Sequence, residues 1–290
     1  SQHRDEQFLR ELCRSFPAVG HLEKRGGGKA WVTDTFEDVN GVTKTIRTLA
    51  GMAHDSKIPI TVVTCLDQIP QVDFPLKNFN PIGSFRMPEY ESLLISFPPF
   101  LEMIAYFEEE EFDEIIISTP GSLGLIALVA AKMLGLSVRG IYHTDFPRFF
   151  RDISGDDRLG EMTWRFMRWF YGKMDQVLVP SLQYKKLLID GGFEPTVIDV
   201  MPRGINLKKF NKEFRKPTFY ADRGLVHSFR FIYAGRISRE KNIEQLLKAF
   251  KMLCDRGVEA DLVLVGDGPL RENLEAKYGS EQILFMGYMY

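Results

Sequence analysis

Two basic residues near the start of a predicted helix could bind a phosphate group. Arg236 directly follows Gly235 at the end of an apolar run, and Lys241 comes shortly before a segment with helical apolar spacing. A helix start carries free N–H groups and a partial positive charge, so cations there are unfavourable unless an anion lies beside them. A phosphate is the anion we expect. Ordinary solvated surface charge is the alternative interpretation.

A second glycine-rich turn follows the next apolar run. Gly266, Asp267 and Gly268 come directly after the predicted strand 261–265. The carboxyl ends of parallel strands share one edge of a sheet, and doubly wound folds bind their ligands there. We therefore expect this turn and the turn at Gly235 to lie near the same edge and to contribute to one phosphate-binding site.

The first half of the chain also offers polar residues at predicted strand ends. His143 follows the strand 138–142, with Asp145 and Arg148 close behind it. An imidazole at the carboxyl end of a central strand can contact a substrate or the reacting centre. A purely structural histidine is the alternative. Thr119 follows the strand 114–118 in a Ser-Thr-Pro-Gly segment.

A glycine also marks the start of the first predicted helix. Gly41 follows Asn40 and precedes the helical pattern of residues 42–53. A glycine at this point lets a substrate approach the backbone closely. A simple turn is the alternative interpretation.

These residues require a scaffold of alternating strands and helices. Short apolar runs between helical patterns predict parallel sheets in an α/β fold. We expect 229–234 to be a buried strand, Ser238 to cap the helix after it, and Pro269 to open the next helix. The remaining predicted strands are 30–33, 60–65, 176–179, 197–201 and 283–286, with a short one at 82–85 and a loop over 68–80.

Composition narrows the class of protein. The 290 residues are enough for two domains, and a net charge of −2 argues against nucleic-acid binding. Cys13, Cys65 and Cys254 lie far apart, which predicts neither a disulfide framework nor a metal site. No apolar run is long enough to span a membrane, and the charged start does not resemble a signal peptide. We expect a location in the cytoplasm, either free or peripherally bound at the inner face of a membrane.

The segment 161–173 is unusually aromatic. Trp164, Trp169 and Phe170 alternate with Arg165 and Arg168. A buried core helix explains this pattern, and a surface in peripheral contact with lipid is the alternative.

The motifs together carry a family resemblance. The segments 233–236, 240–242, 265–269 and 285–287 resemble, in order and spacing, the second domain of the retaining glycosyltransferases of family four. The segments 32–34, 40–42, 118–121, 142–147, 179–181 and 203–206 resemble the first domain. The pieces 118–121 and 143–147 are most similar to the branch that forms glycolipids, including sulfoquinovosyl and mannosyl transferases.

The resemblance implies a fold of two facing Rossmann-like, doubly wound domains, called GT-B. We expect an N-terminal extension (1–28), a first domain that binds the acceptor (29–210), a linker (211–228) and part of a donor-binding domain (229–290). The second domain stops after three predicted strands, before the paired-glutamate motif of the family. A piece of this length is expected to be inactive by itself.

The resemblance also assigns roles to the candidate residues. Arg236 and Lys241 would bind the pyrophosphate of a nucleotide-sugar donor, together with Gly41, Gly235 and the turn of Gly266, Asp267 and Gly268. His143 would be catalytic, and Asn40, Thr119, Asp145 and Arg148 would lie on the side of a lipid or glycan acceptor. No metal or other cofactor is expected.

Two alternatives from other classes stay open. The chain could be a non-catalytic nucleotide-binding module, or a nucleotide-sugar epimerase of the same architecture. An epimerase needs a set of acid–base carboxylates, which the motif positions do not contain.

Overall fold

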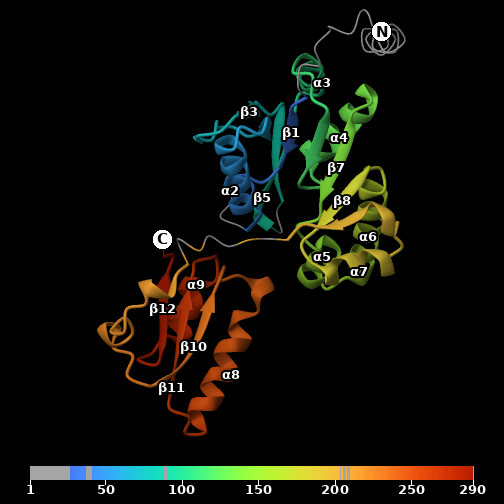
Figure 1. Cartoon of the computed structure of the whole chain (residues 1–290). Helices are drawn as coiled ribbons and strands as arrows, with labels where there is room; N and C mark the ends of the chain where they lie inside the picture. The colour runs from blue at the N-terminus through green and yellow to red at the C-terminus, as the bar shows by residue number, and fades with distance from the viewer. Residues whose placement is uncertain are drawn as a thin grey trace, which may run out of the picture. The chain divides into compact units, whose positions relative to one another are not determined.

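The computed structural model describes residues 27–36, 41–87, 90–202, 204, 207 and 210–289. The chain divides into two compact units (Figure 1). One unit holds Ser1–Pro147 and Glu161–Arg203, and the other holds Arg148–Gly160 and Gly204–Tyr290. The domain limits predicted from the sequence remain a prediction.

The first unit is built on a seven-stranded parallel sheet. Its strand order is β3-β2-β1-β6-β7-β8-β9. The order reverses between β1 and β6, since β2 and β3 continue on one side of β1 while β7, β8 and β9 continue on the other side of β6. Ligands of doubly wound folds bind at such a switch point. The strands are Lys29–Val32 (β1), Ile60–Cys65 (β2), Leu76–Phe79 (β3), Glu114–Ile117 (β6), Ser137–Ile141 (β7), Gln176–Val179 (β8) and Ile198–Val200 (β9).

Two strands lie outside the sequence prediction. β3 falls within the predicted loop 68–80, and β5 (Tyr90–Phe97) pairs antiparallel with β4 (Gly83–Met87). β3 is short and mixes polar with apolar residues, so its apolar content alone does not mark it as a strand. Hydrogen bonds between the side chain of Asn78 in β3 and Thr64 and Leu66 at the end of β2 hold the two strands together.

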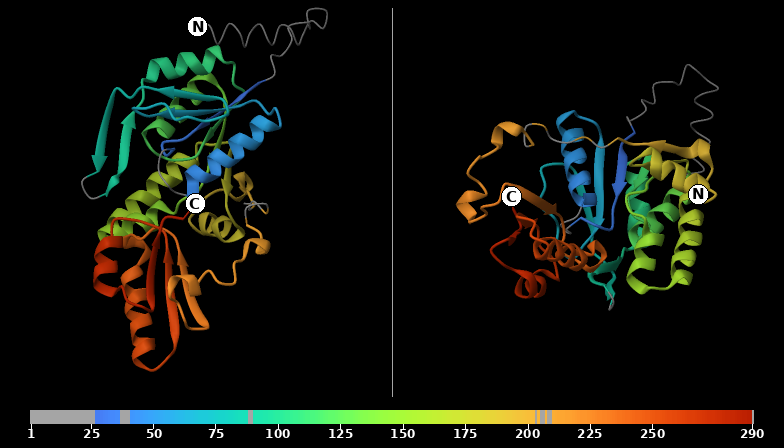
Figure 2. Two further views of the ribbon diagram at one scale, coloured as in Figure 1. Left: turned by 90° about the vertical axis from the view of Figure 1, so that its left-hand side faces the viewer. Right: turned by 90° about the horizontal axis from the view of Figure 1, so that it is seen from below.

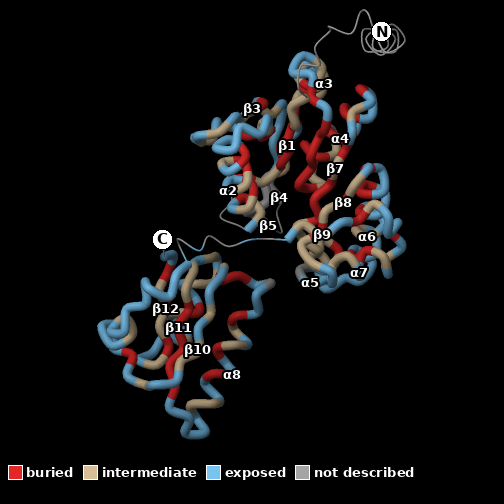
Figure 3. Tube along the Cα trace, in the orientation of Figure 1, coloured by how far each residue is buried: buried red, intermediate tan, exposed pale blue. Residues whose placement is uncertain are grey.

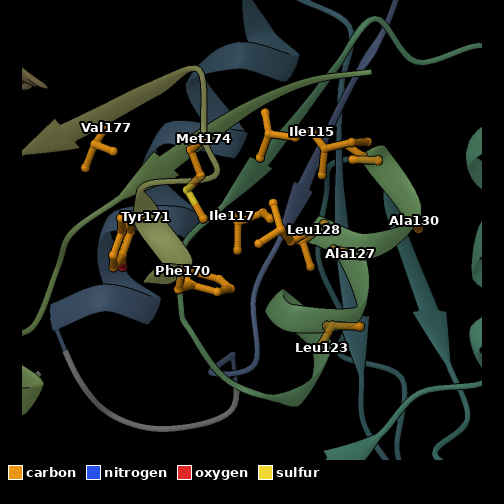
Figure 4. Packing of buried hydrophobic residues seen from close by; sticks show 14 of the residues in the cluster. Ile115, Ile117, Leu123, Ala127, Leu128, Ala130, Phe170, Tyr171, Met174 and Val177 are labelled. Carbon is orange, nitrogen blue, oxygen red and sulfur yellow. The ribbon is translucent and has the colours of Figure 1, made fainter. Parts of the chain in front are cut away.

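Helices cover both faces of this sheet. Strand residues that alternate in sequence enter two separate hydrophobic clusters, as Val32 and Trp31 do. The larger cluster contains residues of α3, α4, α6 and α7, and the smaller one contains residues of α2. Figure 4 shows Ile115, Ile117 and Leu128 packed near Phe170 and Met174 in the larger cluster. The helices are Gly41–Asp55 (α2), Phe100–Glu109 (α3), Ser122–Leu134 (α4), Asp157–Tyr171 (α6) and Leu182–Asp190 (α7), while α5 (Phe146–Ser154) belongs mostly to the other unit.

The second unit contains a three-stranded parallel sheet in the order β10-β11-β12. β10 (Phe229–Ala234), β11 (Ala260–Val265) and β12 (Ile283–Gly287) lie side by side (Figures 1 and 2). α8 (Ile243–Asp255) and α9 (Arg271–Tyr278) contribute to one core cluster with these strands. Short 3₁₀ helices span Pro195–Val197, Lys212–Phe214, Ala221–Arg223 and Arg239–Lys241.

The prediction that β10 is buried is wrong. Phe229 is 58% exposed and Ile232 is 57% exposed, whereas β11 is buried almost throughout (Figure 3). Among the described strands β10 pairs with β11 alone, and Ile232 lies on the face of β10 that points away from the core cluster. Its other residues Phe231 and Tyr233 pack against the core cluster.

Both predicted helix starts in this unit also differ from the structure. Ser238 precedes the 3₁₀ helix Arg239–Lys241 and its side chain makes no capping hydrogen bond. Asn242 then adopts a left-handed conformation (φ 52°), which interrupts the helix, and α8 begins at Ile243. Pro269 lies before α9, which begins at Arg271.

Candidate functional site

The turns after β10 and β11 are hydrogen-bonded to each other. The Gly235 N–H donates to the Val265 carbonyl at 2.9 Å, and the Ile237 N–H donates to the Asp267 carbonyl at 2.9 Å. The Leu270 N–H donates to the Ile237 carbonyl at 3.2 Å. Backbone hydrogen bonds therefore hold the predicted phosphate-binding turns side by side at the carboxyl edge of the sheet.

Glycine is required where these turns approach each other. Gly266 has φ +136°, and a Cβ on it would collide with the carbonyl oxygen of Gly235. A Cβ on Gly268 would collide with the backbone of Ile237. Any other residue would force the turns apart, so the two glycines fix the positions of Arg236 and Asp267.

The charges at this edge come from side chains. Arg236 is half-buried, and the Tyr233 hydroxyl donates to its carbonyl oxygen at 2.7 Å. Lys241 is exposed at the end of its 3₁₀ helix. Asp267 has the only carboxylate among the predicted residues of this site. It forms an ion pair with Arg271 (3.2 Å), which offsets its negative charge.

The amides of the glycine turns are already used within the protein. Gly235 donates to Val265, and Gly266 donates to the Gly287 carbonyl at 2.8 Å. The Gly268 N–H donates to its neighbour Asp267 Oδ1 at 2.7 Å. These three N–H groups are therefore committed, and a phosphate at this edge would depend on Arg236 and Lys241.

At the switch point of the first unit, Asp34 binds the start of α4. Leu123 and Gly124 donate their N–H groups to its two carboxylate oxygens at 2.8 and 3.2 Å. The Thr119 hydroxyl donates to Oδ2 at 2.7 Å and accepts from the Asp34 N–H at 3.0 Å. Asp34 follows β1 and Thr119 follows β6, so this network joins the two strand ends across the switch point.

The carboxylate of Asp34 occupies the start of α4, where the free N–H groups of a helix could otherwise bind an anion. Gly121 precedes α4 and has no side chain to cap it, and a Cβ there would lie 2.5 Å from Asp34 Cγ. Burial raises the pKa of Asp34, and the hydrogen bonds that it accepts act in the opposite direction. Sequence reasoning missed the role of Asp34 at the start of α4. The available signal was a helix with an uncapped glycine at its start and an acidic residue after the first strand.

The predicted residues that follow β6 and β7 fall into three environments. Thr119 is buried and bonded to Asp34. His143 and Asp145 are half-buried after β7, where the Tyr142 hydroxyl donates to Asp145 Oδ1 at 3.4 Å. Arg148 is exposed on α5 and pairs with Asp152 at 3.5 Å.

Gly41 is the first residue of α2, as predicted. A Cβ on it would meet no atom within 4 Å, so packing does not require glycine at this position. Asn40 lies outside the described residues.

The described residues contain no group of three or more His, Cys, Asp or Glu that could hold a metal ion. Across the same parts of the chain, no helix has both the length and the apolar character needed to cross a membrane.

Relatives with known names are similar over most of this chain. The sulfoquinovosyl transferase SQD2 of Arabidopsis thaliana is 28% identical over 79% of this chain and 44% of its own length. An alpha-monoglucosyldiacylglycerol synthase of Streptococcus pneumoniae is 26% identical over 88% of this chain and 60% of its own. The chain therefore spans about half the length of these relatives.

Solved structures show the same fold. Anabaena Alr3699/HepE in complex with UDP and glucose matches with a TM-score of 0.65 at 15% identity, over 91% of this chain and 70% of that one. A putative UDP-N-acetylglucosamine 2-epimerase from Listeria monocytogenes matches with a TM-score of 0.54 at 14% identity, over 91% and 69%. The fold of the chain is thus that of the Rossmann-like domains of GT-B proteins, as predicted from the sequence, and it occurs in more than one class of enzyme.

Both parts of the chain match models of glycosyltransferase families. Residues 223–290 match the model described as glycosyl transferases group 1. Residues 39–209, more than half of the chain, match the model described as Glycosyltransferase Family 4. The motifs at both sheet edges, the fold and these matches agree, and the chain belongs to glycosyltransferase family 4.

Proposed function

We propose that the whole protein transfers a sugar from a nucleotide-diphosphate donor to a lipid acceptor, with retention at the anomeric carbon. The observation that carries this proposal is the pair of interlocked glycine turns with Arg236 and Lys241 beside them. Their positive charges would stabilise the diphosphate as the bond from the anomeric carbon to its oxygen breaks. The oxygen of the acceptor hydroxyl then forms the new bond on the same face of the sugar, and the proton of that hydroxyl passes to the departing diphosphate.

The first unit would supply the remaining groups. His143, Asp145 and Thr119 follow adjacent strands of the parallel sheet, β7 and β6, at the edge where such folds bind ligands. We assign His143 to the sugar hydroxyls or the reacting centre. Gly41, with open space at its Cβ position, would let a substrate approach the first turn of α2.

The lipid acceptor is supported by the names of two relatives, a sulfoquinovosyl transferase and a monoglucosyldiacylglycerol synthase. A glycan acceptor is the competing choice. The epimerase alternative shares the fold, but the family matches of both parts of the chain favour transfer over epimerisation.

Removing one cation tests the diphosphate site. Arg236→Ala and Lys241→Ala should each lower kcat/KM about 10- to 100-fold, because each deletes a charge-assisted hydrogen bond worth about 1.5–3 kcal/mol. The assay measures nucleoside diphosphate released from UDP-glucose or GDP-mannose in the presence of diacylglycerol or an oligosaccharide.

Lys251→Ala, which removes an exposed charge from α8, is the matched control and should leave kcat/KM unchanged. Wild-type kcat/KM in the Arg236→Ala/Lys241→Ala double variant would contradict the assignment. Release of diphosphate only with the oligosaccharide would replace the lipid acceptor by a glycan.

A further inference from the structure

The aromatic helix α6 has one buried and one exposed face. Met167, Phe170 and Tyr171 are fully buried in the larger core cluster. Met162, Phe166 and Trp169 are spaced to share the opposite side of the helix and are 65%, 37% and 49% exposed. Core packing therefore explains only half of the aromatic pattern in this segment.

The structure also divides the aromatic residues that the sequence grouped together. Phe170 is buried, and Trp164 is half-buried with its ring 5.7 Å from that of Phe193. Neither belongs to the exposed face. Trp169 does belong to it, and its ring lies 6.1 Å from that of Phe166, so the two rings form one apolar surface.

Basic side chains lie beside this apolar surface. Arg165 and Arg168, together with Trp169, line a shallow hollow of about 450 Å³. Lys173 is exposed just beyond the end of α6. Within the described residues no ion pair involves Arg165 or Arg168, so both charges are available to an anionic partner.

We propose that this face of α6 (Met162, Arg165, Phe166, Arg168 and Trp169) docks on the surface of an anionic lipid bilayer. A helix with apolar and aromatic residues on one side and basic residues beside them lies in the plane of the membrane interface. Tryptophan favours that interface because its ring is apolar while its N–H remains near water. The arginines match the negative charge of the headgroups.

The docking surface does not depend on the proposed transfer reaction. Vesicle binding needs neither donor nor acceptor, so a failure here and a failure of the proposed function are separate results. A bilayer is favoured over a second copy of the chain because the hollow is basic, and two copies would bring the arginines of both chains together.

Flotation with vesicles tests this proposal. Wild-type protein should bind vesicles of phosphatidylcholine and phosphatidylglycerol more tightly than vesicles of phosphatidylcholine alone. Arg165→Gln/Arg168→Gln should weaken binding to the anionic vesicles about fivefold for each charge removed. Met162→Gln/Trp169→Gln should weaken binding to both kinds of vesicle, because it removes the apolar contact and leaves both arginines in place.

Matched controls remove similar groups from other surfaces. Met52→Gln on α2 replaces another exposed methionine (59%), and Lys251→Gln/Arg256→Gln removes two exposed charges from the α8 region. Both should bind as the wild type does. Absence of binding to anionic vesicles, or equal binding by the α6 variants and the controls, would overturn the proposal. Self-association in light scattering that Met162→Gln/Trp169→Gln abolishes would assign the face to a second copy.

Discussion

Replacing Asp34 by Ala should destabilise the first unit by about 2–4 kcal/mol. The change removes the acceptor of two N–H groups, those of Leu123 and Gly124, and of the Thr119 hydroxyl. Loss of a helix cap costs about 0.5–2 kcal/mol, and a buried donor left without a partner costs about 1–3 kcal/mol. The two contributions overlap, because the cap includes the same N–H groups, so they are not added in full.

Tryptophan fluorescence isolates the unfolding of this unit. Trp31, Trp164 and Trp169 are the only tryptophans in the sequence, and all three lie in the first unit. Trp31 is 4% exposed and donates from Nε1 to Ser118 Oγ at 2.7 Å, next to Thr119. Urea unfolding followed by fluorescence therefore reports on the free energy of unfolding of the unit that contains Asp34.

Two further variants sharpen the Asp34 experiment. Asp34→Asn keeps one acceptor oxygen and should lose less stability than Asp34→Ala. Asp67→Ala removes an exposed carboxylate just beyond the end of β2 and should change stability by less than about 0.5 kcal/mol. If Asp34→Ala unfolds at the same urea concentration as Asp67→Ala, the hydrogen bonds at the start of α4 contribute nothing and the reasoning is refuted.

The remaining predictions concern catalysis and pH. His143→Ala should lower kcat more than it raises KM for the donor, with an unchanged melting temperature, because His143 follows β7 at the ligand-binding edge; a lower melting temperature with unchanged kcat would make it a structural residue. Hydrogen bonds from Lys277 and Tyr278 lower the pKa of Glu244 to about 2. The stability contributed by Glu244 is therefore present above its usual pKa of 4.5 and is lost as the pH falls toward 2. In circular dichroism, Glu244→Gln should remove this part of the acid sensitivity, and an unchanged acid profile would contradict the role of Glu244.

Local sequence predicted the parallel strands well because each is a short apolar run between helical segments. β11 shows this most clearly, since its run 261–265 is buried as expected. β10 has an equally apolar sequence but is largely exposed, because Phe231 and Tyr233 pack against the core cluster whereas Ile232, on the other face of the strand, does not. Which faces of a strand are covered is a property of the whole fold, so no local pattern in residues 229–234 contains it.

Contacts between residues that are far apart in the sequence could not be predicted from local patterns either. Ser238 has the residue type of a helix cap, yet it makes no such bond. The cap of α4 comes instead from Asp34, which is 89 positions before Leu123. A pattern that compares neighbours in sequence finds Ser238 and overlooks Asp34, because only the pairing of β1 with β6 brings Asp34 to the start of α4.

The two units differ in the groups that they offer for binding a phosphate. In the first unit, Asp34 already occupies the start of α4, so the helix N–H groups that could bind an anion there are filled by the protein itself. In the second unit, the amides of Gly235, Gly266 and Gly268 are also committed, but two cations, Arg236 and Lys241, lie close to these turns, and the charge of the nearby Asp267 is offset by Arg271. Under the proposed function, the diphosphate is therefore assigned to the second unit. Its recognition there depends on side-chain charge, whereas the glycines serve to hold the two turns together.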